Sequence, residues 1–294
     1  MRGFVTGATG FIGLAVVKEL IGAGHQVLGL TRSDFGADAL IAAGAEVHRG
    51  TLEDAESLRS GAAICDGVIH TAYNNDFSQF AAAGETDRRA VEVLGTALAG
   101  SDRPLVITSA IGVLSPGRPT TEDDAGDPNG PGAVRIPSEE KALALSSEGL
   151  RSSIIRLPLM VHDRTKQGLA TRLIGLARQT GVSAYVNDGF NRWPAVHLLD
   201  AAHLFRLALE KGVAGSRYHA IAEEEIQLRE IAEVIGRMLN VPVVAISPDK
   251  AAGHFGPLAY FVGADFQASG ARTKEALGWN PAHPGVIADL EQAR

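Results

Sequence analysis

A glycine-rich block near the N-terminus carries the clearest chemical signal in the sequence. Residues 6–13 read Thr-Gly-Ala-Thr-Gly-Phe-Ile-Gly, between a β-branched run and an apolar repeat at helical spacing. Gly7 would permit a tight turn, Gly10 would let a pyrophosphate approach the backbone, and Gly13 would let the helix pack on the strand. The block therefore predicts a dinucleotide site at a helix N-terminus, where unpaired amides face the phosphates.

The end of the second strand-like run indicates which dinucleotide to expect. It reads Thr31-Arg32-Ser33, and it lacks the acid with which an NAD site binds the two ribose hydroxyls. The Arg32 guanidinium and the Ser33 hydroxyl instead suit the 2′-phosphate of NADP. NADP is the expected cofactor and NAD is less favoured, although Arg32 could also be an exposed arginine at a strand end.

These residues need a framework that brings them together, and the first half of the chain supplies one. Short β-branched runs alternate with helical repeats at 11–23 and 86–99; the runs lie at 4–6, 26–31, 45–48, 67–70, 105–108 and 153–157. This rhythm predicts βαβ units with right-handed crossovers. The fold class expected is α/β, with a Rossmann-type doubly wound parallel sheet that binds ligands at the carboxyl ends of its strands.

The second half is less regular. It predicts helices at 169–179, 201–209 and 228–239 and short strands at 184–186, 217–220 and 243–246. We expect an NADP-binding domain over residues 1–165, to which segments around 190–220 return. Residues 166–294 are then mainly a smaller mixed α/β substrate-side domain.

One long interval fits neither a helix nor a strand. Residues 115–134 contain four prolines, four glycines and the acidic run Glu122-Asp123-Asp124. Long loops inside compact domains are mostly lids, binding loops or disordered stretches. Because this one follows the fifth strand, we expect it to be a lid over the ligand cleft.

Several segments resemble the short-chain dehydrogenase/reductase superfamily, in its extended and atypical branch related to NAD-dependent epimerases/dehydratases and 3β-hydroxysteroid dehydrogenases. They are the glycine block, Val68-Ile69-His70-Thr71-Ala72, Thr108-Ser109, Arg156-Leu157-Pro158 and Pro194-Ala195-Val196-His197. Together with the motifs above, the resemblance implies a set of cofactor contacts: Gly7, Thr9, Gly10, Phe11, Ile12, Gly13, Arg32, Ser33, Thr51, Leu52, Thr71, Ala72, Thr108 and Leu157. Thr51 stands where relatives commonly place an Asp against the adenine, so that contact should be weak.

The resemblance also implies a catalytic Tyr-x-x-x-Lys pair, and this chain has none. The residues four beyond its tyrosines (73, 185, 218 and 260) are Phe77, Gly189, Ala222 and Ala264. Aligning Lys141 with the family lysine puts Pro137 at the tyrosine position, whereas the preferred register puts Arg135 there and Glu139 at the lysine position. The family's serine falls on Ala110, one residue after Ser109.

Another proton donor is therefore needed, since general acid or base help contributes about 10²–10⁴ in rate. Tyr73, which follows the fourth strand with Asn74 and Asn75, is the first candidate, and Ser109 and His162 are the others. For Tyr73 the alternative is an aromatic side chain that lines the cleft with no acid role.

Composition narrows the partners. The 294 residues are 45% hydrophobic with a net charge of −7 and no basic block, so no nucleic-acid partner is expected. We expect no membrane span, no signal peptide and a cytoplasmic location, because no apolar run reaches about 18 residues and Cys65 is the only cysteine. A homodimer is expected only by analogy with the superfamily.

No metal site is expected either. His197, Asp200 and His203 have spacings that a metal could use, but Asp200 is more simply a helix cap.

These observations predict an NADP-dependent oxidoreductase that acts on a small organic substrate with altered proton transfer. A non-catalytic NADP-binding sensor or regulatory protein is the main alternative. A sugar-nucleotide epimerase or dehydratase is a weaker alternative, because the sequence has no cluster of basic residues placed to bind a second diphosphate.

Overall fold

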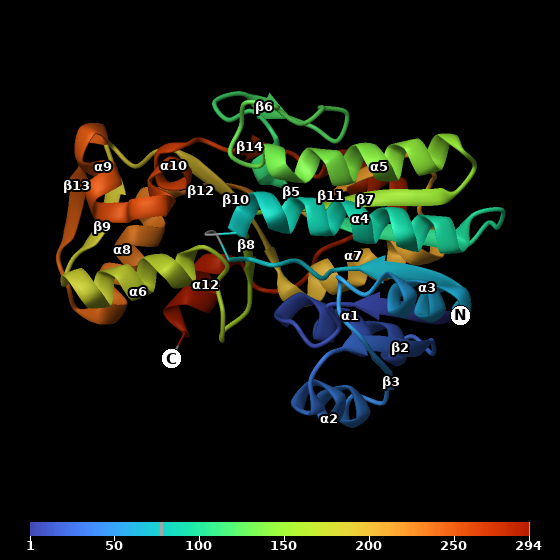
Figure 1. The fold of residues 1–294 in the computed structure, drawn as a ribbon. Helices are drawn as coiled ribbons and strands as arrows, with labels where there is room; N and C mark the ends of the chain where they lie inside the picture. The colour runs from blue at the N-terminus through green and yellow to red at the C-terminus, as the bar shows by residue number, and fades with distance from the viewer. Residues whose placement is uncertain (77–78, 294) are drawn as a thin grey trace.

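The computed structural model describes residues 1–76 and 79–293 and has the α/β fold expected from the sequence (Figure 1). Its centre is a seven-stranded sheet with the order β11-β7-β5-β4-β1-β2-β3, in which every neighbouring pair is parallel. The strands are β1 (Arg2–Thr6), β2 (Gln26–Thr31), β3 (Glu46–Arg49), β4 (Gly67–His70), β5 (Pro104–Ala110), β7 (Arg151–Leu157) and β11 (Arg217–His219). Strand order reverses between β1 and β4, so the sheet is doubly wound.

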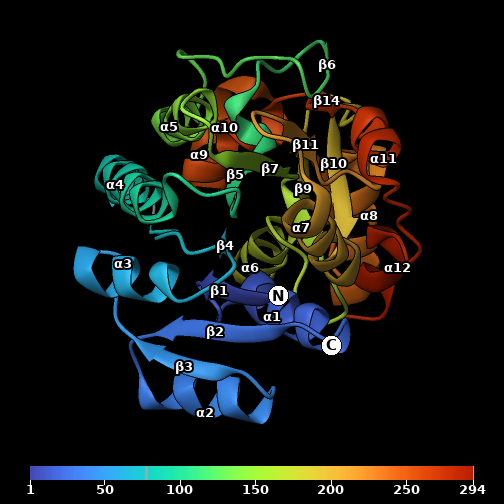
Figure 2. The ribbon, with the colours of Figure 1, turned by 90° about the vertical axis from the view of Figure 1, so that its right-hand side faces the viewer.

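Helices cover both faces of this sheet, because successive strand residues point to opposite sides. Phe4 of β1 packs with one group of helices and Val5 with the other. Figure 2 shows α3 (Ala55–Ala63), α4 (Phe80–Leu98) and α5 (Ile136–Ser147) on one side and α1 (Phe11–Gly22) and α7 (Leu198–Lys211) on the other, while α2 (Asp34–Ala42) lies beside β3. None of the described helices is both long and apolar enough to cross a membrane.

A smaller mixed lobe follows β7. Its strands are β8 (Met160–His162), β10 (Arg192–His197) and β12 (Glu223–Gln227) in one sheet, with β9 (Ser183–Val186) and β13 (Val243–Ile246) paired in another. Its helices are α6 (Ala170–Thr180), α8 (Leu228–Leu239), α9 (Pro248–Phe255), α10 (Ala259–Gly263) and α12 (Val286–Glu291). These elements share a separate apolar cluster that includes the fully buried Trp193.

The chain returns to the large sheet twice after β8. First, α7 packs against α1 and β11 joins the sheet beside β7. Later, Trp279, which follows α11 (Ala271–Leu277), enters the same apolar cluster as Val5 and donates from Nε1 to the carbonyl of Asp200 at 3.0 Å. The large domain is therefore completed by residues near the end of the described chain.

Residues 115–134 do not have the position that the sequence predicted for them. Strand β6 (Pro119–Thr120) pairs with β14 (Gln267–Ala268), and Glu122 accepts hydrogen bonds from the amide and hydroxyl of Thr273 at 2.8 and 2.7 Å. No residue of this segment lines the large pocket at the carboxyl ends of the strands. The structure does not support the lid, because partners more than 140 positions away in the chain fix the segment elsewhere.

A buried ion pair joins this segment, α5 and β7. Arg156, with no exposed surface, donates from Nε and Nη2 to Glu139 at 2.9 and 2.6 Å, and from Nη1 to the Asp124 carbonyl at 2.8 Å. Burial by itself would raise the pKa of Glu139, but the hydrogen bonds and charge of Arg156 outweigh it and hold that pKa below its usual value. The two charges therefore depend on each other.

We expect Arg156→Met to lower the free energy of unfolding by about 3–5 kcal/mol, because it leaves the Glu139 carboxylate buried with only the more distant Arg217, at 3.8 Å, as an ion-pair partner. The double variant Arg156→Met/Glu139→Met should recover most of this loss in urea unfolding at pH 7. Since the pKa of Glu139 is lowered on folding, the pair's contribution is complete above the unfolded pKa of about 4.3 and is lost as pH falls further. Equal losses in the single and double variants would contradict the coupling.

Candidate functional site

A pocket of about 960 Å³ opens at the carboxyl ends of β1, β2 and β4. Ligands of open α/β sheets bind at this edge, where the strand order reverses. Of the cofactor contacts predicted from the sequence, all except Thr108 line the pocket; the residues are Gly7, Thr9, Gly10, Phe11, Ile12, Gly13, Arg32, Ser33, Thr51, Leu52, Thr71, Ala72 and Leu157. Thr108 instead donates its hydroxyl to the carbonyl of His70 at 2.8 Å.

Two glycines of the block are required by the fold itself. Gly7 has φ +65°, and a Cβ there would lie 2.6 Å from the amide nitrogen of Ala72. A Cβ on Gly13 would lie 2.0 Å from the Gly7 carbonyl oxygen. Both contacts are far inside van der Waals distance, so these glycines let β1, α1 and the end of β4 meet.

Gly10 differs, because the protein leaves room beside it. Among the described residues, leaving out its chain neighbours and its own helix, one atom lies within 4 Å of a Cβ built at this position, the Gly7 carbonyl oxygen at 3.2 Å, and Gly10 itself lines the pocket. Helix α1 begins after Gly10 with no side-chain cap, so the first amides of the helix are left for another acceptor. This cradle fits the pyrophosphate of a nicotinamide dinucleotide.

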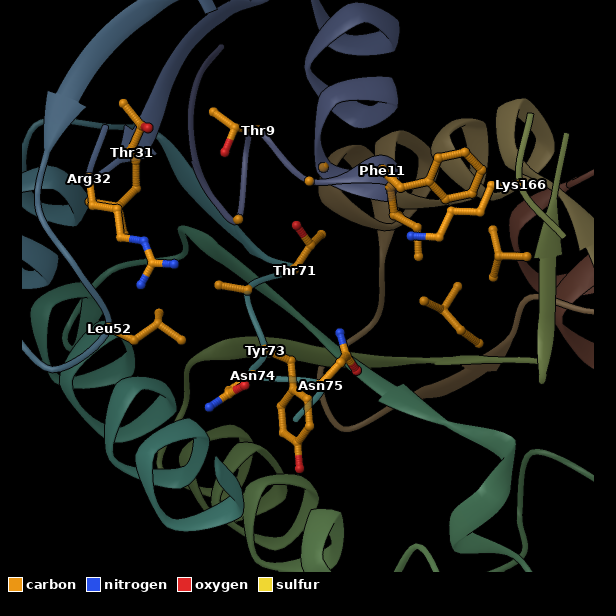
Figure 3. Close-up of a pocket in the computed structure, with 18 of the residues that line it drawn as sticks. Thr9, Phe11, Thr31, Arg32, Leu52, Thr71, Tyr73, Asn74, Asn75 and Lys166 are labelled. Carbon is orange, nitrogen blue, oxygen red and sulfur yellow. The ribbon is translucent and has the colours of Figure 1, made fainter. Parts of the chain in front are cut away.

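Arg32 lies at one end of the pocket, directly after β2 (Figure 3), and Ser33, the next residue, also lines the pocket. The Ser33 hydroxyl caps α2 by accepting from the amide of Gly36 at 3.1 Å. The neighbouring acid, Asp34, is paired with Arg49 at 2.6 Å, so its charge is already compensated. The exposed Arg32 guanidinium is therefore placed to meet an anionic group on a bound ligand.

Tyr73 lines the pocket beyond the glycine block, and its ring lies 3.9 Å from the guanidinium carbon of Arg135. Arg135 itself is held by the Thr108 carbonyl and lies 3.7 Å from a carboxylate oxygen of Asp87. Burial raises the pKa of Tyr73, and the nearby positive charge of Arg135 opposes this only in part. The phenol is thus protonated at neutral pH. Figure 3 shows its hydroxyl directed away from Thr9 and Thr71.

The other two candidate proton donors are not brought to the pocket. Ser109 is buried at the end of β5, and its hydroxyl has no hydrogen-bond partner among the described residues. His162 is fully buried on β8, where Nδ1 is 2.7 Å from a carboxylate oxygen of Asp289. Neither residue belongs to the lining of the pocket.

Two further cations that sequence reasoning missed line the pocket. They are Lys166, in the turn after β8, and Arg172, in the first turns of α6. No motif surrounds either residue, so the sequence offered no signal. Figure 3 shows Lys166 beside Phe11, across the pocket from Arg32.

The histidines near α7 are arranged differently from the sequence prediction. His203 pairs with Glu19 at 3.0 Å, whereas His283 lies beside Asp200, with ligand-type atoms of His197, Asp200 and His283 within 4.8 Å of one another. Asp200 is not the helix cap. That role belongs to His197, whose Nδ1 accepts from the Leu199 amide at 3.2 Å.

Asp200 has another task, because α7 begins at Leu198 and places this side chain inside the first turn. Its carboxylate accepts hydrogen bonds from the amides of Ala282 and His283 at 3.0 and 3.1 Å. The residue therefore anchors the segment that follows Trp279 to the large domain.

Comparison with known proteins agrees with this geometry. Residues 4–221 match the model of the NAD dependent epimerase/dehydratase family. An uncharacterized protein of Schizosaccharomyces pombe is 47% identical over 290 residues, covering 99% of this chain and 98% of that protein. A 4-hydroxy-2-methyl-3-oxo-4-farnesyl-3,4-dihydroquinoline-1-oxide ketoreductase of Stigmatella aurantiaca is 28% identical, covering 87% of this chain and 80% of that enzyme.

Solved structures show the same fold. The dTDP-glucose 4,6-dehydratase of Streptomyces venezuelae, solved with NAD bound, superposes with a TM-score of 0.79 at 22% identity, covering 99% of this chain and 96% of that one. A UDP-glucose 4-epimerase of Thermotoga maritima gives 0.77 at 20% identity, covering 100% and 97%.

We expect Gly10→Val to abolish NADPH binding at concentrations that saturate the parent protein, because the side chain would fill the space beside the first amides of α1. Fluorescence titration of NADPH measures the loss, and circular dichroism checks that the variant is folded. Gly22→Val, at the end of the same helix and with no atom within 4 Å of its Cβ, is the matched control. If a folded Gly10→Val protein bound NADPH as well as the parent does, the glycine block would be a structural turn with no role in cofactor binding.

Proposed function

Because the chain belongs to the NAD-dependent epimerase/dehydratase family, we propose that it is an NADP(H)-dependent oxidoreductase that reduces a small organic substrate with an altered proton donor. One observation carries the proposal. A single pocket combines a dinucleotide cradle at Gly10, a cation at Arg32 and a phenol, Tyr73, packed against a guanidinium.

The preference for NADP rests on Arg32. Its planar guanidinium can form two charge-assisted hydrogen bonds with a phosphate, and no acid lies at the end of β2 to take the ribose hydroxyls of NAD. The one acid of the pocket lining, Glu53, follows Thr51 and Leu52 rather than β2. The dehydratase structure with bound NAD shows the same fold at too low an identity to decide between the two cofactors.

Tyr73 is the proposed proton donor. When bound, the nicotinamide supplies a hydride. The raised pKa of Tyr73 keeps the phenol protonated, so its Oη can deliver a proton to a substrate oxygen. Arg135, against the ring, would then stabilise the phenolate that remains. A protonated phenol next to a cation favours the direction of reduction.

A non-catalytic NADP-binding sensor is the second candidate, and one observation favours it. The Tyr73 hydroxyl is buried and has no hydrogen-bond partner within the described residues. Figure 3 shows the hydroxyl directed away from Thr71, so proton transfer to a ligand beside the glycine block requires the side chain to move, whereas a sensor needs no such movement.

We expect Arg32→Ala to weaken NADP binding by roughly 10- to 150-fold and to leave NAD binding nearly unchanged, since a charged hydrogen bond contributes about 1.5–3 kcal/mol. Calorimetric titration with both cofactors measures this, and Arg59→Ala removes a surface arginine of α3 as a control. Equal losses for both cofactors, or tighter NAD binding by the parent, would overturn the NADP assignment.

We expect Tyr73→Phe to reduce turnover by about 10²–10⁴ with little change in NADPH affinity, because only the hydroxyl is removed. NADPH consumption is followed with a panel of ketones, enones, imines and quinones. Tyr185→Phe is a matched control, since that ring also lies near an arginine, Arg229, but outside the pocket. A parent that binds NADPH yet reduces nothing in the panel would favour the sensor, and full turnover by Tyr73→Phe would eliminate this proton donor.

A further inference from the structure

Asp87, on α4, is a buried carboxylate for which the function proposed so far gives no role. The residue is only 1% exposed, and a carboxylate is buried to this degree only where charges or hydrogen bonds compensate it. Asp87 does not line the pocket. Any effect that it has on a ligand there must therefore pass through its neighbours.

Three side chains from other segments surround this carboxylate. Oδ2 accepts from the hydroxyl of Ser138 on α5, and Oδ1 lies 3.1 Å from Nε2 of His70 at the end of β4. Oδ1 also lies 3.7 Å from Nη1 of Arg135, the last residue of the 3₁₀ helix η3 (Ala133–Arg135). Burial by itself would raise the pKa of Asp87, but the charge of Arg135 and the hydrogen bonds with His70 and Ser138 outweigh it and hold that pKa below its usual value. Asp87 is therefore ionised at neutral pH.

Arg135 connects this carboxylate with the pocket. It is almost completely buried, and its Nη2 donates to the carbonyl of Thr108. The guanidinium carbon lies 3.9 Å from the centre of the Tyr73 ring, and Tyr73 lines the pocket (Figure 3). A single guanidinium thus interacts with both the Asp87 carboxylate and the face of the aromatic ring.

The two charges act on the Tyr73 phenol in opposite directions. The positive charge of Arg135 stabilises the phenolate and so lowers the pKa of Tyr73, whereas the negative charge of Asp87 raises it. Because both groups are buried, solvent and salt screen their fields less than they screen a surface ion pair. The ionisation of Tyr73 therefore depends on whether the charge of Arg135 is offset.

We propose that Asp87 is a positioning residue of the proposed reaction, which helps to hold the Arg135 guanidinium against Tyr73 and offsets part of its charge at the phenol. With Asp87 in place the phenol keeps its proton until a substrate oxygen takes it. The proton then passes from Oη to that oxygen, and the negative charge stays on the phenolate beside Arg135. This inference rests on the proposed function, because it assigns the control of the same proton donor.

Fluorine NMR of the Tyr73 phenol tests the proposal without requiring turnover. The chain has four tyrosines, so replacing them with 3,5-difluorotyrosine gives few resonances, and Tyr73→Phe identifies the one from Tyr73. Fluorine lowers the intrinsic pKa of the phenol, which keeps the titration within the range where the protein is folded. We expect Asp87→Asn to raise the ionisation constant of Tyr73 by about three- to thirtyfold, because Arg135 then lacks its negative partner.

A matched control removes a different buried carboxylate. Asp289 is also 1% exposed and lies 2.7 Å from a histidine nitrogen, Nδ1 of His162, but within the described residues it has no contact with Arg135 or Tyr73. Asp289→Asn should therefore leave the ionisation constant of Tyr73 at the parent value.

Arg135 provides a test in the opposite direction. Arg135→Met removes the positive charge and should lower the ionisation constant of Tyr73, whereas Arg135→Lys keeps the charge and should stay closer to the parent. Loss of packing would expose the ring to water and would shift Asp87→Asn and Arg135→Met in the same direction. Opposite shifts thus distinguish an effect of charge from disruption. NADPH affinity should remain at the parent value, because neither residue lines the pocket.

Each other outcome overturns the inference. A folded Asp87→Asn protein with an unchanged or lower ionisation constant would show that Asp87 does not offset Arg135. A shift of the same sign in Arg135→Met, or an equal shift in Asp289→Asn, would make the effect structural. If Asp87→Asn does not fold, Asp87→Ser, which also removes the charge, takes its place with the same expectation. Failure of the parent to bind NADPH, or full turnover by Tyr73→Phe, would instead refute the proposed function itself.

Discussion

The pocket depends on one constraint, which is the close approach of the glycine turn after β1 to the end of β4. The Thr71 hydroxyl donates to the carbonyl of Thr6 at 2.8 Å, and any Cβ on Gly13 would collide with the Gly7 carbonyl. Backbone atoms of β1, α1 and β4 therefore touch with nothing between them. Because of this contact, the start of α1 points its uncapped amides at the space where strand order reverses. A bulkier residue at either glycine would move the helix away from the sheet and close that space.

Several polar and charged side chains are buried next to the pocket, and they interact although they come from segments that are distant in sequence. Asp87 of α4 lies near Arg135, accepts from the hydroxyl of Ser138 and lies 3.1 Å from Nε2 of His70. A hydroxyl, an imidazole and a carboxylate thus connect β4, α4 and the start of α5, and Arg135 links them to the ring of Tyr73. Such a network restricts how these elements can pack against one another. If one element shifted, a buried charge would lose its partner. The residues around Tyr73 are thus tied together by hydrogen bonds and ion pairs, whereas its own hydroxyl has no hydrogen-bond partner among the described residues and its ring contacts the Arg135 guanidinium.

Sequence reasoning succeeded where the signal was local. The spacing of Gly7, Gly10 and Gly13 after a β-branched run predicted the turn, the helix and the pocket they line, and Arg32 was placed by its position after β2. It failed where long-range contacts decide. The proline-rich segment around Pro119 pairs with β14, and no residue pattern within the segment predicts that pairing. Lys166 likewise gains its surroundings only from tertiary structure, since no motif marks it. Arg135 stands at the family's tyrosine position in the preferred register, but only tertiary structure brings it against the ring of Tyr73.

The burial of Trp279 has a consequence for how the protein folds. Its indole belongs to the apolar cluster that contains Val5, so β1 and a residue that follows α11 share one core although they are far apart in sequence. Contacts of such large separation in sequence close slowly. The apolar core of the large sheet is therefore complete only when the segment anchored by Asp200 has docked.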